Sequence, residues 1–74
     1  MSRMEYLVII EEGPTSFSAY VPDLPGCVAA AETREEMLAL MQEALEFHIE
    51  EIKASGEDVP PPTSHSELVK VRAA

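Results

Sequence analysis

The sequence predicts an α+β fold, a two-layer sandwich in which an antiparallel sheet of β-β-β-α-β order carries one long helix on one face. Three observations lead to this prediction. Short stretches rich in β-branched and aromatic residues, separated by glycine and proline turns, come first in the chain. A long amphipathic stretch follows at about 34–55, and another strand-like stretch lies at about 67–72. We expect residues 1–74 to form a single domain, because so short a chain has material for one core only.

The first two strands are predicted at about 5–12 and 16–21, joined as a hairpin by a Gly-Pro-Thr-Ser turn. Side chains alternate between the two faces of a strand, and both faces of the first segment are apolar. This strand is therefore either central in the sheet or meets a second subunit through the face that carries Leu7 and Ile9.

A stiff corner separates the second strand from a third strand at about 27–31. Pro22 lacks an N–H and so ends regular pairing. Pro25 presets its own φ and Gly26 can adopt a positive one, as a tight turn requires. Asp23 can bond to backbone amides of the turn, or it can present its carboxylate to a partner, and both interpretations stay open.

The helix is predicted over about 34–55. Thr33 and Glu36 have the spacing of a capping box, and Gly56 suits the left-handed position that ends a helix. One apolar stripe is expected to face the sheet. Its members are Met37, Met41, Ala44, Leu45, His48, Ile49 and Ile52.

A second, narrow apolar stripe of the helix consists of Leu40 and Phe47, seven residues apart. One sheet face does not need this additional apolar surface, so we expect it to lie in an oligomer interface, as Leu7 and Ile9 also do. The acidic residues Glu43, Glu46 and Glu50 are expected on the solvent face of the helix.

After the helix, residues 57–66 form a proline-rich spacer, because each residue before a proline is pushed out of the helical region. A last strand is predicted at 67–72 with Val69 and Val71 facing inward. The stiff spacer allows this strand to join its own sheet or that of a neighbouring copy.

The charge balance is the most informative feature of the composition. The chain has 14 acidic and 5 basic residues and a net charge of −9. Nucleic-acid affinity needs lysine and arginine, so direct binding of DNA or RNA is not expected. An acidic surface favours a basic protein partner, although acidity can also simply keep a small protein soluble.

Size and targeting give further expectations. A small core is marginal and Cys27, the only cysteine, cannot form a disulfide within the chain, so we expect a homodimer or a higher oligomer. There is no apolar run of about 20 residues and no signal-peptide pattern, so no membrane association is expected and the protein is predicted to be cytoplasmic.

Residues with catalytic or metal-binding chemistry are sparse. Cys27, His48 and His65 do not have ligand spacing, so no metal or cofactor is expected. Cys27 fits a small buried hydrophobe, and His48 fits a packed or interface residue because it lies in the apolar stripe. No phosphate loop or nucleophile elbow is present. An enzyme is therefore not predicted.

Taken in their order along the chain, these segments resemble a known family. The residues that carry the resemblance are Tyr6 to Glu11, Tyr20-Val21-Pro22-Asp23-Leu24-Pro25-Gly26-Cys27-Val28, Glu32-Thr33-x-Glu35-Glu36, Glu43-Ala44-Leu45 and Val59-Pro60-Pro61-Pro62-Thr63. On these residues the chain is similar, over nearly its whole length, to the HicB-like antitoxins. The resemblance implies a β-β-β-α-β domain that is usually dimeric or larger.

The resemblance also implies a partner, a small basic HicA-like toxin that has a fold like a double-stranded-RNA-binding domain and cleaves mRNA with a histidine. The antitoxin would bind this toxin and block its active site. We expect the contact at the corner and on the acidic helix face. The candidate residues are Tyr20, Asp23, Leu24, Pro25, Gly26, Glu43, Glu46 and Glu50.

Two departures from the family pattern are visible. Ala31 stands where members often have glycine before the Asp/Glu-Thr pair, which favours regular strand at this point. Many members also carry a C-terminal DNA-binding domain, and the sequence ends after the last predicted strand, so operator binding is not expected. The alternative function is a HicB-like structural or regulatory oligomer without a toxin partner.

Overall fold

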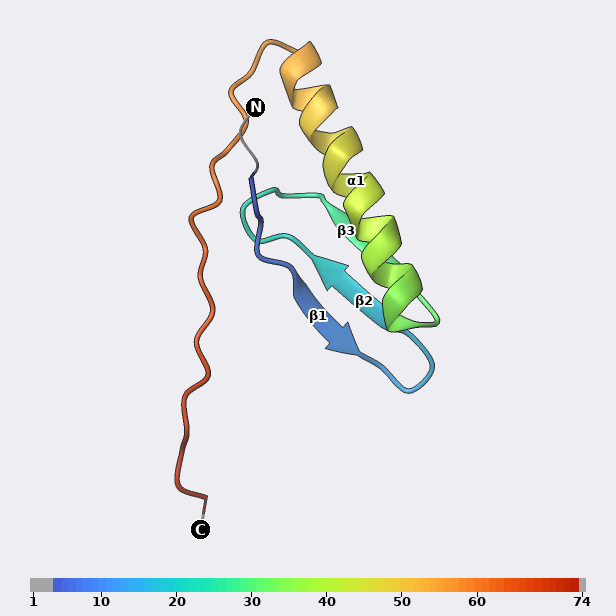
Figure 1. The fold of residues 1–74 in the computed structure, drawn as a ribbon, viewed down its shortest axis with the longest axis vertical. Coiled ribbons are helices and arrows are strands. Elements are labelled where there is room, and N and C mark those ends of the chain that lie inside the picture. Colours follow the sequence, from blue (N-terminus) through green and yellow to red (C-terminus); the bar gives the residue numbers. More distant parts are fainter. Residues whose placement is uncertain (1–3, 74) are drawn as a thin grey trace.

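A computed structural model describes residues 4–73 and shows an α+β architecture, a three-stranded sheet with one long helix (Figure 1). The strands are β1 (Ile9–Glu12), β2 (Phe17–Tyr20) and β3 (Val28–Ala31), and the helix is α1 (Arg34–Ala54). The sheet has the order β1-β2-β3 and both pairings are antiparallel. The helix lies over one face of the sheet and packs mainly on β3.

Alternation along the strands decides which side chains meet the helix. In β2, Ala19 is buried and Phe17 is half-buried, whereas Ser18 and Tyr20 are exposed on the other face. In β3, Ala29 and Ala31 face the core. Their small side chains allow the helix to lie close to this edge of the sheet.

The corner between β2 and β3 contributes to the core as well as to the turn. Its backbone closes on itself: the Cys27 N–H donates to the Leu24 carbonyl, the Leu24 N–H donates to the Val21 carbonyl, and the Val21 N–H donates to the Cys27 carbonyl, each at 3.1 Å. Gly26 has a φ of +87°, as a residue without Cβ readily adopts. Leu24 is thereby directed into the core and is completely buried. The fully buried core consists of Ala19, Val21, Leu24, Cys27, Met37 and Met41.

The ends of α1 follow the sequence signals. The Thr33 side chain accepts a hydrogen bond from the Glu36 N–H at 3.1 Å, which confirms the predicted N-cap. Gly56 lies just past the helix with a φ of +81°. Glu35 and Glu36 in the first turn and Lys53 in the last turn complement the helix dipole.

The strands are shorter than predicted, and the last one is not formed within this chain. The first ladder begins at Ile9, although residues 5–12 were expected to be strand. Residues 67–72 join no ladder, and Val69 and Val71 are 76 % and 81 % exposed, so their predicted inward orientation is wrong for the single chain. The physical reason is that this segment leaves the domain beyond the last contact that holds it, as described below. The fourth strand of the β-β-β-α-β order is therefore not confirmed.

Candidate protein-binding surface

The carboxylate of Asp23 connects the corner to the proline-rich spacer, residues 57–66. Oδ2 of Asp23 accepts hydrogen bonds from the backbone N–H groups of Thr63 and Ser64 at 3.0 and 2.9 Å. Oδ1 accepts from the hydroxyls of the same two residues at 3.1 and 2.8 Å. The Tyr6 hydroxyl also donates to the Pro60 carbonyl. We call these contacts the tail clamp, because they hold residues 60–64 against the domain.

The electrostatics of the tail clamp favour its closed form at neutral pH. The pKa of Asp23 is lowered, above all by the hydrogen bonds from Ser64 and then by those from Thr63, because they stabilise the ionised carboxylate. The pKa of Tyr6 is raised, first by burial and second by the negative charge of Asp23. At neutral pH Asp23 is therefore ionised and can accept the four hydrogen bonds. Tyr6 keeps the proton that it donates to the Pro60 carbonyl.

The clamp changes the interpretation of the predicted contact residues at the corner. The Asp23 carboxylate already accepts four hydrogen bonds within the chain. Leu24 is in the core, so its side chain is not available to a partner. Pro25 and Gly26 are exposed. Thr63 was not predicted as a partner of Asp23; the available signal was a hydroxyl residue directly after a proline run, where free backbone amides are expected.

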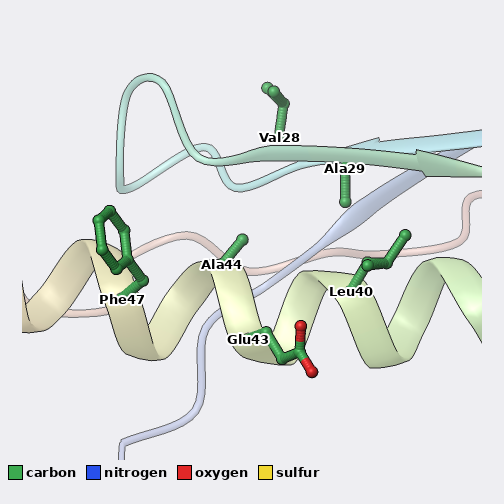
Figure 2. A pocket seen from close by; sticks show the side chains of 6 residues that line it. All are labelled: Val28, Ala29, Leu40, Glu43, Ala44 and Phe47. Atoms are coloured by element: carbon green, nitrogen blue, oxygen red, sulfur yellow. The ribbon is translucent and has the colours of Figure 1, made fainter.

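Exposed apolar side chains gather instead at the β3 edge, where a groove runs between β3 and α1 (Figure 2). Phe47, Val28 and Leu40 are 66 %, 63 % and 45 % exposed. Figure 2 shows Ala29 pointing from the strand toward the helix and Ala44 pointing back toward the strand. We call this the β3–α1 groove. Its lining consists of Val28, Ala29, Leu40, Glu43, Ala44 and Phe47.

One side of α1 carries both acidic and apolar residues next to this groove. Leu40, Glu43, Phe47 and Glu50 follow one another at spacings of three and four residues, which places them on one side of a helix. All four are exposed. We call them the acidic–apolar stripe. Glu46 is also exposed and lies three residues after Glu43 and four before Glu50, so it borders the stripe on its acidic side.

The face of the sheet opposite the helix is also open and partly apolar. The register aligns Ile9 with Tyr20 and Tyr20 with Val28, so these three side chains form a row across the sheet. Tyr20 is 42 % exposed, whereas Leu7 and Ile9 are half-buried. A shallow hollow covers part of this face. Its lining consists of Glu11, Ser18, Ala19, Tyr20, Val28, Ala29 and Ala30.

Val28 belongs to both hollows, so the groove and the open sheet face form one surface that wraps around the β3 edge. From the sequence, Tyr20 was expected in the partner contact and Leu40 and Phe47 in an oligomer interface, whereas Val28 was not selected. The available signal was the alternation in β3: because Ala29 and Ala31 face the core, Val28 must face outward.

The described part of the chain contains little that could act chemically. Within residues 4–73 no group of three or more His, Cys, Asp and Glu side chains is placed to hold a metal ion. Cys27 is buried, its thiol donates to the Met41 sulfur at 3.9 Å, and burial raises its pKa, so the reactive thiolate is disfavoured. None of the helices in this range is long and apolar enough to cross a bilayer. The arrangement offers apolar and acidic contact area, which is suited to binding a protein.

Comparison with known proteins identifies relatives of this arrangement. The profile of the family described as "HicB_like antitoxin of bacterial toxin-antitoxin system" matches residues 6–73. "Antitoxin HicB 2" of Photorhabdus laumondii is 32 % identical over 77 residues, which cover 97 % of this chain and 52 % of the relative. "UPF0150 protein Ta0767" of Thermoplasma acidophilum is 36 % identical over 58 residues, covering 77 % of this chain and 84 % of that protein.

A phage protein and a solved structure extend the comparison. An uncharacterized 14.9 kDa protein of Haemophilus phage HP1 is 37 % identical over 57 residues, which cover 77 % of this chain but 43 % of the phage protein. The chain thus spans about half the length of two of these relatives. A chain in the structure of a HicA3 and HicB3 toxin-antitoxin complex superposes with a TM-score of 0.67 at 32 % identity, over 80 % of this chain and 70 % of that one.

Proposed function

Because this chain belongs to the family of HicB-like antitoxins, we propose that it is the antitoxin of a toxin–antitoxin pair and binds a small basic HicA-like toxin. The observation that carries the proposal is the family match over residues 6–73, supported by the likeness to a chain of a HicA3–HicB3 complex. The protein is proposed to act by binding alone, without catalysis or a cofactor, and in the cytoplasm, where mRNA is translated.

The charge of the chain supports a basic protein as the partner. With 14 acidic and 5 basic residues, the chain attracts cationic surfaces and speeds their encounter. The same balance disfavours phosphate backbones, so direct nucleic-acid binding is not part of the proposal. A toxin that cleaves RNA needs a basic surface for its substrate, and an acidic protein that covers this surface competes with the RNA.

The toxin is proposed to dock on the acidic–apolar stripe and the adjoining β3 edge. The exposed apolar side chains Leu40 and Phe47 supply area that leaves water on binding, and Phe47 is the most exposed apolar side chain of the groove. Glu43 and Glu50 flank them on the same side of the helix. Tyr20 and Val28 continue the surface onto the open sheet face. A bound toxin would have its active site covered by this surface.

Co-expression with the neighbouring small basic reading frame tests the function. Rescue of growth together with a stable co-purified complex is the expected result. A neighbour that is harmless, or that does not associate with this chain, would instead favour an oligomeric regulatory protein without a toxin.

A charge reversal tests the proposed surface. Glu43→Lys, on the stripe, is expected to weaken toxin binding about 10-fold or more, because truncating or reversing a central contact typically costs more than about 1 kcal/mol. Glu57→Lys is the matched control, since it makes the same change of net charge at an exposed position beyond the end of α1. Equal affinities of the two variants, measured by calorimetry, would show that only the overall charge matters and that the stripe is not the docking site.

A further inference from the structure

The C-terminal segment, residues 65–73, carries apolar side chains that contact little within the chain. Leu68 is 99 % exposed, Val69 76 % and Val71 81 %. Single exposed apolar residues are common, but a run of them that also alternates with charged residues is a strand pattern. The segment has the sequence of a strand but joins no ladder within residues 4–73.

The residues just before this segment are held against the domain, so the direction in which the segment leaves the domain is fixed. The tail clamp holds Thr63 and Ser64 through four hydrogen bonds to Asp23, and Tyr6 holds Pro60. Beyond Ser64 the chain runs extended along the β1 side of the sheet without joining it (Figure 1). With the clamp closed, the segment projects away from its own core.

An acceptor for such a strand exists in β1. The sheet order is β1-β2-β3, so β1 is an edge strand and pairs with β2 on one side only. The N–H and C=O groups on its outer side can form a ladder with an added strand. The β1 strand has four residues and the strand-like segment at 67–72 is long enough to cover it.

Charge complementarity points to the β1 edge as the acceptor of the segment, and because the segment projects away from its own core, that edge is the one of a second copy. Lys70 and Arg72 are two of the five basic residues of a chain whose net charge is −9. Edge strand β1 ends in the exposed acidic pair Glu11 and Glu12. Opposite charges on neighbouring strands stabilise a pairing, whereas like charges oppose it.

We propose that residues 67–72 of one copy add as a fourth strand to the β1 edge of a second copy, so that two chains exchange their C-terminal strands. The exchange gives the exposed valines a surface to cover and completes each sheet on the side away from α1. It enlarges the core of a small domain, whose own core is marginal. It uses the β1 edge, whereas the proposed toxin surface lies at the β3 edge, so the two proposals can be tested apart.

Light scattering coupled to gel filtration tests the dimer. The full chain is expected to elute as a dimer, and a chain that ends at Ser66 is expected to be a monomer with the clamp residues retained. Val69→Pro should act in the same way, because proline removes a ladder N–H, whereas Ala73→Pro, outside the predicted strand, should leave the dimer intact. A full-length monomer, or a truncated chain that remains a dimer, overturns the proposal.

A charge exchange distinguishes pairing between chains from pairing within one chain. One variant carries Glu11→Lys and Glu12→Lys, and the other carries Lys70→Glu and Arg72→Glu. Each alone is expected to be mainly monomeric, because like charges then face each other across the added ladder. Mixed together they should form a heterodimer, since each tail then meets a β1 edge of opposite charge. If mixing leaves two monomers, the strands are not exchanged, whatever the toxin-binding result.

Discussion

Asp23 on the corner and Glu43 on the helix are both acidic residues of the same acidic chain, yet they are used in different ways. The Asp23 carboxylate accepts four hydrogen bonds from Thr63 and Ser64 and so holds the chain to itself. Glu43 is exposed beside the apolar groove. This difference indicates that the distinctive corner motif stabilises the fold, whereas the proposed partner surface lies on a helix face that has no sequence motif.

The largest expected effect comes from removing the core side chain of the corner. Leu24→Ala should lower the free energy of unfolding by about 2–5 kcal/mol, because Leu24 is completely buried and its loss leaves a cavity. Chemical denaturation followed by circular dichroism measures this change. A loss below about 0.5 kcal/mol would mean that Leu24 faces outward in solution, as a contact residue would, and would remove the distinction between the two regions.

A smaller effect, on binding rather than stability, is expected on the helix side. Phe47→Ala should weaken binding of the toxin about 10-fold, a change of about 1.4 kcal/mol, because Phe47 is exposed in the free chain and would be buried in the complex. Its stability should stay within about 0.5 kcal/mol of the parent, as is usual for exposed positions.

Leu38→Ala is the matched control for Phe47→Ala, since Leu38 is an exposed apolar residue of α1 outside the groove lining. Calorimetry on both variants, combined with their unfolding curves, separates loss of affinity from loss of fold. If both variants bind as the parent does, the apolar part of the stripe makes no contact with the toxin.

The sequence predicted the elements whose signals are local. The cap at Thr33, the end at Gly56 and the turn at Gly26 each depend on a few neighbouring residues, and the structure confirms them. The stripe of Leu40 and Phe47 was also predictable, because helical periodicity separates it from the core-facing residues.

The features that the sequence analysis missed depend on pairs of residues far apart in the chain. The hydrogen bond from Ser64 to Asp23 joins residues 41 positions apart, and no residue near Asp23 in the sequence indicates it. The strand at 67–72 was predicted from an alternating pattern, but this pattern does not say which strand is its neighbour, and within residues 4–73 the segment joins no ladder. Alternation in β3 could have placed Val28 on the outer face, but its high exposure also depends on β3 lying at the edge of the sheet, and a local pattern does not give the strand order.

The smallest expected effect is local and depends on pH. Asp23→Asn removes the charge of the acceptor, so the amides of Thr63 and Ser64 should exchange with solvent faster while the core amides keep their protection. Because the hydrogen bonds lower the pKa of Asp23 in the folded chain, the clamp contributes fully above the ordinary pKa of an aspartate and is lost as pH falls through the lowered value. In the parent, the same two amides should therefore lose protection only in acid.

The control for this prediction is Asp58→Asn, which makes the same change on an exposed residue of the proline-rich spacer. It should leave the exchange of the Thr63 and Ser64 amides unaltered. Tyr6 sets the limit of the tail clamp at high pH. Because its pKa is raised, its hydroxyl keeps the proton for the hydrogen bond to Pro60 until the pH rises above the ordinary range of a tyrosine. Exchange at Thr63 and Ser64 that is equally fast in the parent and both aspartate variants would show that the carboxylate of Asp23 does not hold the tail, and Asp23 would again be available to a partner.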